Sequence, residues 1–314
     1  MWEPPGIEVE MVELEGGGRR NICIAHINVY EESTKANLDR FRLNAAFLAE
    51  NGVSAVVLPH MHPYGPVLKH RKGLTKRDVR ARLALSRDSR YFRGLRAIAS
   101  ANGMDIVLPG FIEAVSNRLY VSSGFFSSSS EELFEVQRKV FLSEEEKALG
   151  FRSGSKPRIF TSGDLNFTVF LDDELLRPEL FRYASLAGST LFIVGEPMVN
   201  PPKNYVQVAI GISAALHVWM ILPGGIYITK EGDVYVAPTI ILSPGGDVAY
   251  RYGGTAERLI LVNAPSSARR ALDLEELNIY LKLYRELYRA LPRSVGEVGR
   301  EVDPDKAEGA RRPR

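Results

Sequence analysis

The sequence contains a single cysteine, Cys23, so no disulfide can form within the chain. Cys23 stands in the apolar run Ile22-Cys23-Ile24-Ala25, a pattern typical of a buried strand. A cysteine buried in apolar surroundings behaves as a small, inert hydrophobic side chain. We therefore expect Cys23 to be a core residue, and one cysteine gives no reason to expect an oxidising compartment.

The sequence also lacks long apolar runs and a strong net charge. No stretch approaches the ~18 uninterrupted apolar residues of a transmembrane helix, so we expect no membrane partner. The segment 1–15 has neither the basic start nor the apolar stretch of a signal peptide. A formal net charge of +2 over 314 residues gives no argument for nucleic acid as a partner. The expected location is the cytoplasm.

Apolar strand patterns alternate with amphipathic helix patterns along most of the chain, and 45% of the residues are hydrophobic. This alternation predicts an α/β fold in which helices cover sheets. We expect residues 1–20, rich in Pro, Glu and Gly, to be an N-terminal extension or edge segment, and residues 21–292 to form one domain. The charged tail 293–314 is expected to be disordered or to dock on a partner subunit.

The most informative segment is an apolar strand at 167–171, a turn at Asp172-Asp173 and a helix that opens near Pro178. Such a strand–turn–helix holds the first turn residue at the sheet edge, beside free N–H groups of the helix N-terminus. The segment resembles the nucleophile elbow of the nitrilase (carbon–nitrogen hydrolase) superfamily, in which a strand precedes Cys-Tyr-Asp and then Phe-Pro-Glu. When the two are aligned on Pro178-Glu179, the family's catalytic cysteine falls on Asp172.

Two further segments extend this resemblance over roughly residues 20–290. The segment 52–65 resembles the one that carries the family's catalytic glutamate after Leu-Pro, and His60 stands at that position. The segment 138–142 resembles the one that bears the catalytic lysine, which matches Lys139. Some family members place a supporting glutamate soon after it, where this chain has Glu145 and Glu146. The resemblance implies a four-layer α-β-β-α sandwich of the nitrilase type and pairing into a homodimer or higher homo-oligomer.

The resemblance assigns roles that this sequence does not fully support. In the family a thiolate attacks an amide or nitrile carbon, a glutamate acts as general base and acid, and a lysine stabilises the oxyanion. A carboxylate at position 172 is a far weaker nucleophile, and beside Lys139 it would form an ion pair that occupies the cation. The sequence therefore predicts loss of the thiol-dependent reaction. It predicts a homologue that binds a small polar or carboxylate metabolite, or that acts as an interaction partner.

Three alternatives stay open. His60 and Asp172 could activate water while Lys139 stabilises the oxyanion, which would make the chain an atypical hydrolase of non-peptide carbon–nitrogen bonds. A metal site from His60, His62 and Asp172 is a weaker alternative, since such ligands suit zinc or manganese, and no other cofactor is expected. An assembly role could use the late amphipathic helix 272–291.

Three side chains are expected to line the pocket: Tyr64, Asp173 and Glu196.

Overall fold

The computed structural model describes residues 6–15, 17–65, 67–71, 73–195, 204–265 and 274–290. The chain divides into two compact units, Met1–Ala268 and Arg269–Arg314. The first unit holds every described strand and the candidate site, and the second is described by helix α8 (Leu274–Ala290). Within the described residues, no helix is long and apolar enough to cross a bilayer.

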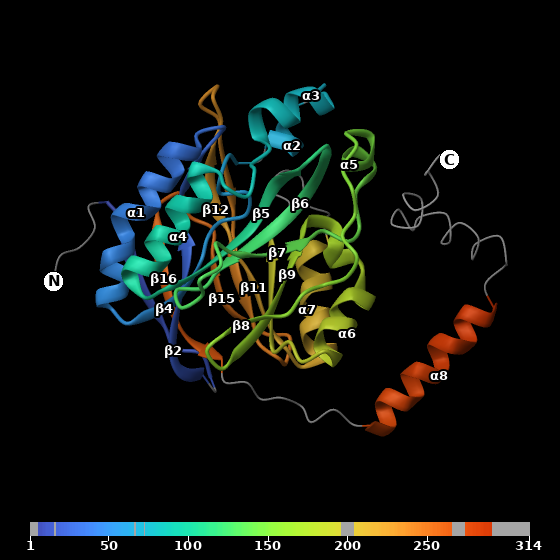
Figure 1. Cartoon of the computed structure of the whole chain (residues 1–314). Helices are drawn as coiled ribbons and strands as arrows, with labels where there is room; N and C mark the ends of the chain where they lie inside the picture. The colour runs from blue at the N-terminus through green and yellow to red at the C-terminus, as the bar shows by residue number, and fades with distance from the viewer. Residues whose placement is uncertain are drawn as a thin grey trace, which may run out of the picture. The chain divides into compact units, whose positions relative to one another are not determined.

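The first unit contains a seven-stranded mixed sheet covered on its outer face by two helices, α1 (Thr34–Glu50) and α4 (Arg90–Asn102) (Figure 1). Helix α4 forms because its apolar residues recur at helical spacing, and because the Ser89 hydroxyl caps the Phe92 N–H at 3.3 Å. Gly103, in the left-handed conformation, ends it. The strand order is β1 (Glu8–Val12), β16 (Arg258–Pro265), β2 (Gly17–His26), β4 (Val53–Val57), β5 (Asp105–Val115), β6 (Arg118–Phe126) and β7 (Glu135–Arg138).

A second sheet of six strands is covered by helices α6 (Pro178–Leu186) and α7 (Tyr205–Leu216). Its strand order is β15 (Val248–Tyr252), β14 (Thr239–Leu242), β11 (Trp219–Leu222), β10 (Leu191–Gly195), β9 (Leu165–Leu171) and β8 (Phe160–Ser162). Between this sheet and its helices, the ring of Phe170 packs against Phe181 and Phe192 at centroid distances of 3.9 and 5.5 Å. A small third sheet pairs β13 (Val234–Ala237), β12 (Gly225–Ile228) and β3 (Asn28–Tyr30).

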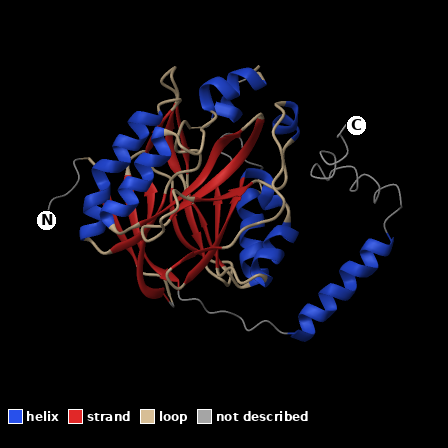
Figure 2. Ribbon diagram, in the orientation of Figure 1, coloured by secondary structure: helices blue, strands red, loops and turns tan. Residues whose placement is uncertain are grey.

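The two large sheets face each other across an apolar core. Phe125 of β6 packs against Phe160 and Phe167 of the second sheet, with ring centroids 5.6 and 5.3 Å apart. The layers are therefore helices, sheet, sheet, helices (Figure 2), and the expected α-β-β-α sandwich is confirmed. The remaining short helices are α2 (Val67–His70), α3 (Lys76–Asp78), η1 (Val79–Leu83), α5 (Glu144–Ala148) and η2 (Asp172–Leu176).

The structure sharpens several expected boundaries. Cys23 is fully buried in β2, as predicted. Within the first 20 residues, β1 is an edge strand that pairs in parallel with β16. Strand β7 begins at Glu135 and ends at Arg138, directly before Lys139. The N–H of Lys139 still donates to the Val121 carbonyl oxygen of β6 at 2.8 Å, but the two N–H groups after it, those of Val140 and Phe141, donate to a side-chain carboxylate, and the ladder stops there.

Candidate functional site

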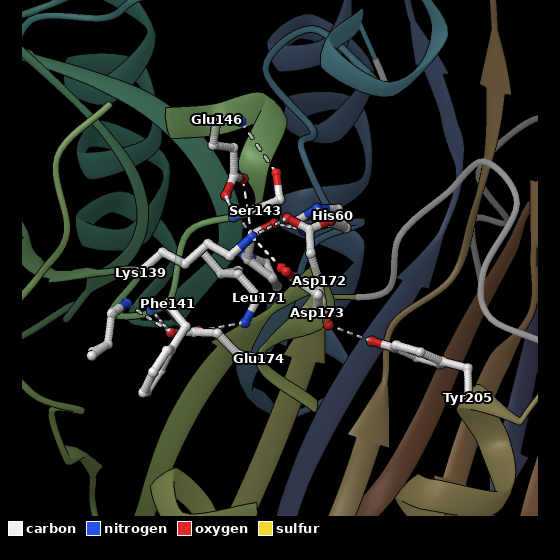
Figure 3. A network of polar contacts seen from close by, with 12 residues as sticks. His60, Lys139, Phe141, Ser143, Glu146, Leu171, Asp172, Asp173, Glu174 and Tyr205 are labelled. Carbon is white, nitrogen blue, oxygen red and sulfur yellow. Dashed lines mark hydrogen bonds and ion pairs between the residues drawn. The ribbon is translucent and has the colours of Figure 1, made fainter. Parts of the chain in front are cut away.

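Three strand ends meet where the two sheets face each other. His60 follows the end of β4 by three residues, Asp172 follows the last residue of β9, and Lys139 follows the last residue of β7. Nε2 of His60 lies 3.3 Å from Oδ1 of Asp172, and Nζ of Lys139 lies 3.4 Å from Oδ2 of the same carboxylate (Figure 3). The three positions that the sequence singled out are thus adjacent, and all three side chains are buried.

The elbow has the shape that the sequence predicted, and its backbone is strained. Asp172 has a φ of 50°, a left-handed conformation that costs a non-glycine residue about 1 kcal/mol or more. The Tyr205 hydroxyl of α7 donates to the Asp172 carbonyl oxygen at 3.1 Å and fixes this turn. The chain then enters α6 at Pro178, whose missing N–H suits the first helical position.

Lys139 is surrounded by three carboxylates, of which two are buried and that of Asp173 is partly exposed. We call this group the Lys139 cluster: Lys139, Glu146, Asp172 and Asp173. Its ammonium nitrogen is 2.9 and 3.0 Å from the two carboxylate oxygens of Glu146 and 2.6 Å from Oδ1 of Asp173. The Lys139 side chain is 0% exposed. Burial alone would lower the pKa of Lys139, but Asp172, Glu146 and Asp173 outweigh it and raise the pKa above its usual value. The ammonium therefore stays charged and compensated.

The Lys139 cluster holds three acids and one base, and burial raises the pKa of one of these acids. Burial raises the pKa of Glu146, an effect that Lys139 opposes and Asp172 reinforces. Glu146 also closes a capping box, since it accepts the N–H of Ser143 at 2.7 Å. The supporting glutamate that the resemblance implied is thus in contact with Lys139, while Glu145 lines the neighbouring cavity.

His60 occupies a slot that two glycines leave open. Its Nδ1 lies 2.9 Å from the carbonyl oxygen of Pro109, which can only accept, so Nδ1 carries a proton. A side chain at Gly110 would come within 2.6 Å of the ring, and one at Gly195 would overlap it. Nε2 then faces a carboxylate oxygen of Asp172, and that contact is favourable when a proton lies between the two atoms. Both ring nitrogens of His60 therefore have a protein partner.

A cavity of about 20 Å3 adjoins the cluster. A single water needs roughly 10–15 Å3, so in this conformation the space suits one small molecule of water size. Its wall includes His60, Met61, Tyr64, Leu68, Glu146 and Asp172. Lys139 is not part of this wall, and the described residues that form it present carboxylates to the cavity and no ammonium group.

The other predicted pocket residues lie in different places. Tyr64 lines the cavity, but its hydroxyl accepts the backbone N–H of Ile112 and is thereby occupied. Asp173 is 36% exposed and contacts Lys139 from outside the cavity wall. Glu196 lies outside the described residues.

His62 does not join His60 and Asp172. Its Nδ1 is 2.5 Å from the Tyr91 hydroxyl, and its ring packs edge-on against Phe41. Burial lowers the pKa of His62 to about 3, so the ring is neutral. Among the residues that the structure describes, no three His, Cys, Asp or Glu side chains are grouped to hold a metal ion. The metal alternative thus gains no support from the geometry.

Glu174 is a site residue whose structural role the sequence did not predict, although its carboxylate belongs to the acidic run 172–174 that was considered for a metal. Its carboxylate accepts the backbone N–H groups of Val140 at 2.7 Å, Phe141 at 3.3 Å and Leu171 at 3.0 Å, and so fastens the elbow to the segment after Lys139. Burial raises the pKa of Glu174 to about 7 despite these donors. The one sequence signal was an acid two residues beyond Asp172.

We expect Glu174→Gln to flatten the pH dependence of stability. The folded pKa of about 7 exceeds the unfolded value of 4.5, so the folded state binds more protons between these values. Stability must then fall as the pH rises from about 4.5 to 7, by up to about 1.4 kcal/mol per pH unit from this group. Urea unfolding at pH 4.5, 5.5, 6.5 and 7.5 measures this slope.

The control for this prediction is Glu179→Gln, which changes an exposed carboxylate in the first turn of α6 and should leave the slope intact. At pH 7.5 the free energy of unfolding of the Glu174→Gln variant is also expected to be about 1–3 kcal/mol lower. The side-chain –NH2 of the glutamine would face the Leu171 N–H, so two donors would meet without an acceptor. An unchanged slope in Glu174→Gln would show that Glu174 does not titrate as described.

Comparison with known proteins gives a family-model match and structural matches. The family model described as carbon-nitrogen hydrolase matches residues 21–272. A variant of the Nesterenkonia AN1 amidase from the nitrilase superfamily is 17% identical with a TM-score of 0.64, over 85% of this chain and 98% of that one. The crystal structure of an amidase from Nesterenkonia sp. is 18% identical with a TM-score of 0.63, over 85% and 98%. A comparison with proteins of curated function found no match.

A double mutant of the Nesterenkonia AN1 amidase in complex with acrylamide is similar to the same degree, at 17% identity and a TM-score of 0.64. At these identities the structural likeness shows a shared fold and nothing of the substrate. The family model spans most of the chain, from within β2 to beyond the end of β16. The chain therefore belongs to the carbon-nitrogen hydrolase family.

Proposed function

We propose that this chain is a family member that has lost thiol-dependent hydrolysis of amides and nitriles and keeps the centre as an internal structural cluster. The observation that carries the proposal is the enclosure of Lys139 by the carboxylates of Glu146, Asp172 and Asp173, with the lysine side chain 0% exposed. A cation held in this way is not available to a developing oxyanion, which requires a preorganised and unoccupied donor.

The remaining two positions support the same proposal. One oxygen of Asp172 faces His60 and the other faces Lys139, so neither is directed at a substrate carbon. Nε2 of His60 faces Asp172 and its Nδ1 faces the Pro109 carbonyl oxygen, so both nitrogens that could act as a general base are engaged within the protein. The cavity holds about one water, which disfavours even small amides without rearrangement.

The inherited pocket also disfavours a carboxylate metabolite as its ligand. Its wall presents Glu145, Glu146 and Asp172, whereas the ammonium group of Lys139 lies behind them. A bound carboxylate would therefore meet charges of its own sign. Among the roles that the sequence left open, we favour an interaction partner that forms a cytoplasmic homo-oligomer.

The second candidate is an atypical hydrolase of non-peptide carbon–nitrogen bonds, favoured by the convergence of His60, Lys139 and Asp172 in one place. A panel of amides, nitriles and N-carbamoyl compounds, assayed for ammonia release with the purified full chain, separates the two. We expect the purified chain to release ammonia no faster than the same mixture without protein. Turnover that disappears in both Lys139→Ala and Asp172→Ala would establish the hydrolase instead.

A further inference from the structure

Helix α5 lies at the tip of a loop whose two ends are fixed beside strand β6 (Figure 1). The loop begins at Lys139, whose N–H donates to the Val121 carbonyl oxygen of β6 at 2.8 Å. It returns at Arg152, whose N–H donates to the Leu119 carbonyl oxygen of β6, also at 2.8 Å. The N–H of Gly154 then donates to the Lys139 carbonyl oxygen at 2.7 Å and closes the loop. Backbone hydrogen bonds thus attach the base of the loop to the first sheet.

The tip of this loop has far fewer ties to the rest of the protein than its base. The N–H groups of residues 147, 149, 150 and 151 donate to carbonyl oxygens of α5 or of the residue directly before it. Glu146 is the one buried residue of α5, and the other four are exposed. Among the described side chains of α5, that of Glu146 alone bonds outside the tip, with its two oxygens 2.9 and 3.0 Å from Nζ of Lys139 (Figure 3).

The tip also forms part of the wall of the cavity beside the Lys139 cluster. Four lining residues come from the tip: Ser143, Glu145, Glu146 and Leu149. The others come from the segment 60–68 and from Asp172 of the elbow. All of them belong to the same compact unit. A movement of the tip away from the segment 60–68 would therefore enlarge the cavity.

Gly150 supplies a point about which the tip can turn. Its φ is 78°, in the left-handed region that glycine adopts without strain, and hinges are commonly a few residues at the end of an element. Phe151 directly after it is buried and stays with the core. On the other side of the tip, Glu174 accepts the N–H groups of Val140 and Phe141. The stretch between these two fixed points is the part that can move.

We propose that residues 142–150 form a lid over the cavity, and that the contact of Glu146 with Lys139 is the latch that keeps it closed. Leu142 and Leu149 are partly buried against the core and add apolar contact. Opening takes both oxygens of Glu146 away from Lys139, and it admits molecules larger than the single water that the closed cavity suits. The lid concerns access to the cavity, so it does not rest on the loss of hydrolysis.

A cysteine in the cavity wall measures the opening. Met61→Cys places a thiol among the lining residues, while the native Cys23, fully buried in β2, reports global unfolding of the same molecule. The full chain carrying Met61→Cys is treated with iodoacetamide, and peptide mass spectrometry follows the two cysteines. Adding Glu146→Gln places a side-chain –NH2 against the donors of Lys139 or Ser143. It is expected to speed alkylation of the introduced cysteine at least tenfold, with Cys23 unmodified.

The matched control is Glu144→Gln, which makes the same change on the exposed side of α5, where Glu144 contacts Lys147 at 2.6 Å. It should leave the alkylation rate of the introduced cysteine unchanged. Glu146→Asp keeps the charge but shortens its reach by one methylene, and it should give an intermediate rate. Equal rates in Glu144→Gln and Glu146→Gln would overturn the latch. Alkylation of Cys23 in step with the introduced cysteine would show that Glu146 holds the whole core, and would overturn the lid.

Discussion

Replacing Lys139 by methionine is expected to lower the free energy of unfolding by about 3–5 kcal/mol, because breaking a buried ion pair leaves its partner uncompensated. Here the loss of one ammonium leaves the carboxylates of Glu146, Asp172 and Asp173 together in a site whose lysine is 0% exposed. Methionine keeps nearly the same length and volume, so the packing term stays small. Urea unfolding followed by circular dichroism measures the change.

The matched control for Lys139→Met is Lys147→Met. Lys147 also contacts a glutamate, Glu144, at 2.6 Å, but its side chain is 56% exposed. Exposed pairs contribute about 0–1 kcal/mol, so the control should change little. If Lys139→Met were as stable as the control, Lys139 would be a group kept for chemistry and not for structure.

Installing a thiol at the elbow is expected to leave the chain inactive until the base is restored as well. Asp172→Cys supplies the family's nucleophile, but His60 still stands where the family has a glutamate. The double variant His60→Glu/Asp172→Cys restores both, and a positioned general base contributes about 10²- to 10⁴-fold. We therefore expect a gain of that order in ammonia release from formamide or acetamide over Asp172→Cys alone.

Lys139→Met added to His60→Glu/Asp172→Cys is the control, because it removes the oxyanion donor and should abolish the gained activity. The smallest amides are chosen because the cavity is only about 20 Å3. Turnover by Asp172→Cys alone, at the level of the double variant, would show that His60 can serve as the base and that only the nucleophile was lost.

The sequence predicted the fold and the three central positions because those signals are local. An apolar strand, a turn residue and Pro178 specify the elbow over a dozen residues, and the observed strand β9 and helix α6 follow them. The positions of His60 and Lys139 followed from the resemblance of the segments 52–65 and 138–142 to those of the family. The four-layer architecture followed from the resemblance, since no single motif encodes the packing of one sheet on another.

The features that close the site could not be predicted because they join residues far apart in sequence. Glu174 reaches back 34 positions to the N–H of Val140. Gly195 makes room for His60 from a strand of the other sheet. The charge balance around Lys139 depends on which carboxylates reach its ammonium group. The sequence shows that Glu146, Asp172 and Asp173 are present, but it does not show how close each lies to Lys139.

The claim that Lys139 is the counter-ion of Asp172 is tested most directly by making Lys139→Met twice, with and without the carboxylate of Asp172. Its cost in unfolding free energy is measured in the parent chain and again in the Asp172→Asn variant. The claim predicts a cost lower by about 1–3 kcal/mol in the second background, since contacting charges are coupled. Equal costs in the two backgrounds, within about 0.5 kcal/mol, would contradict it.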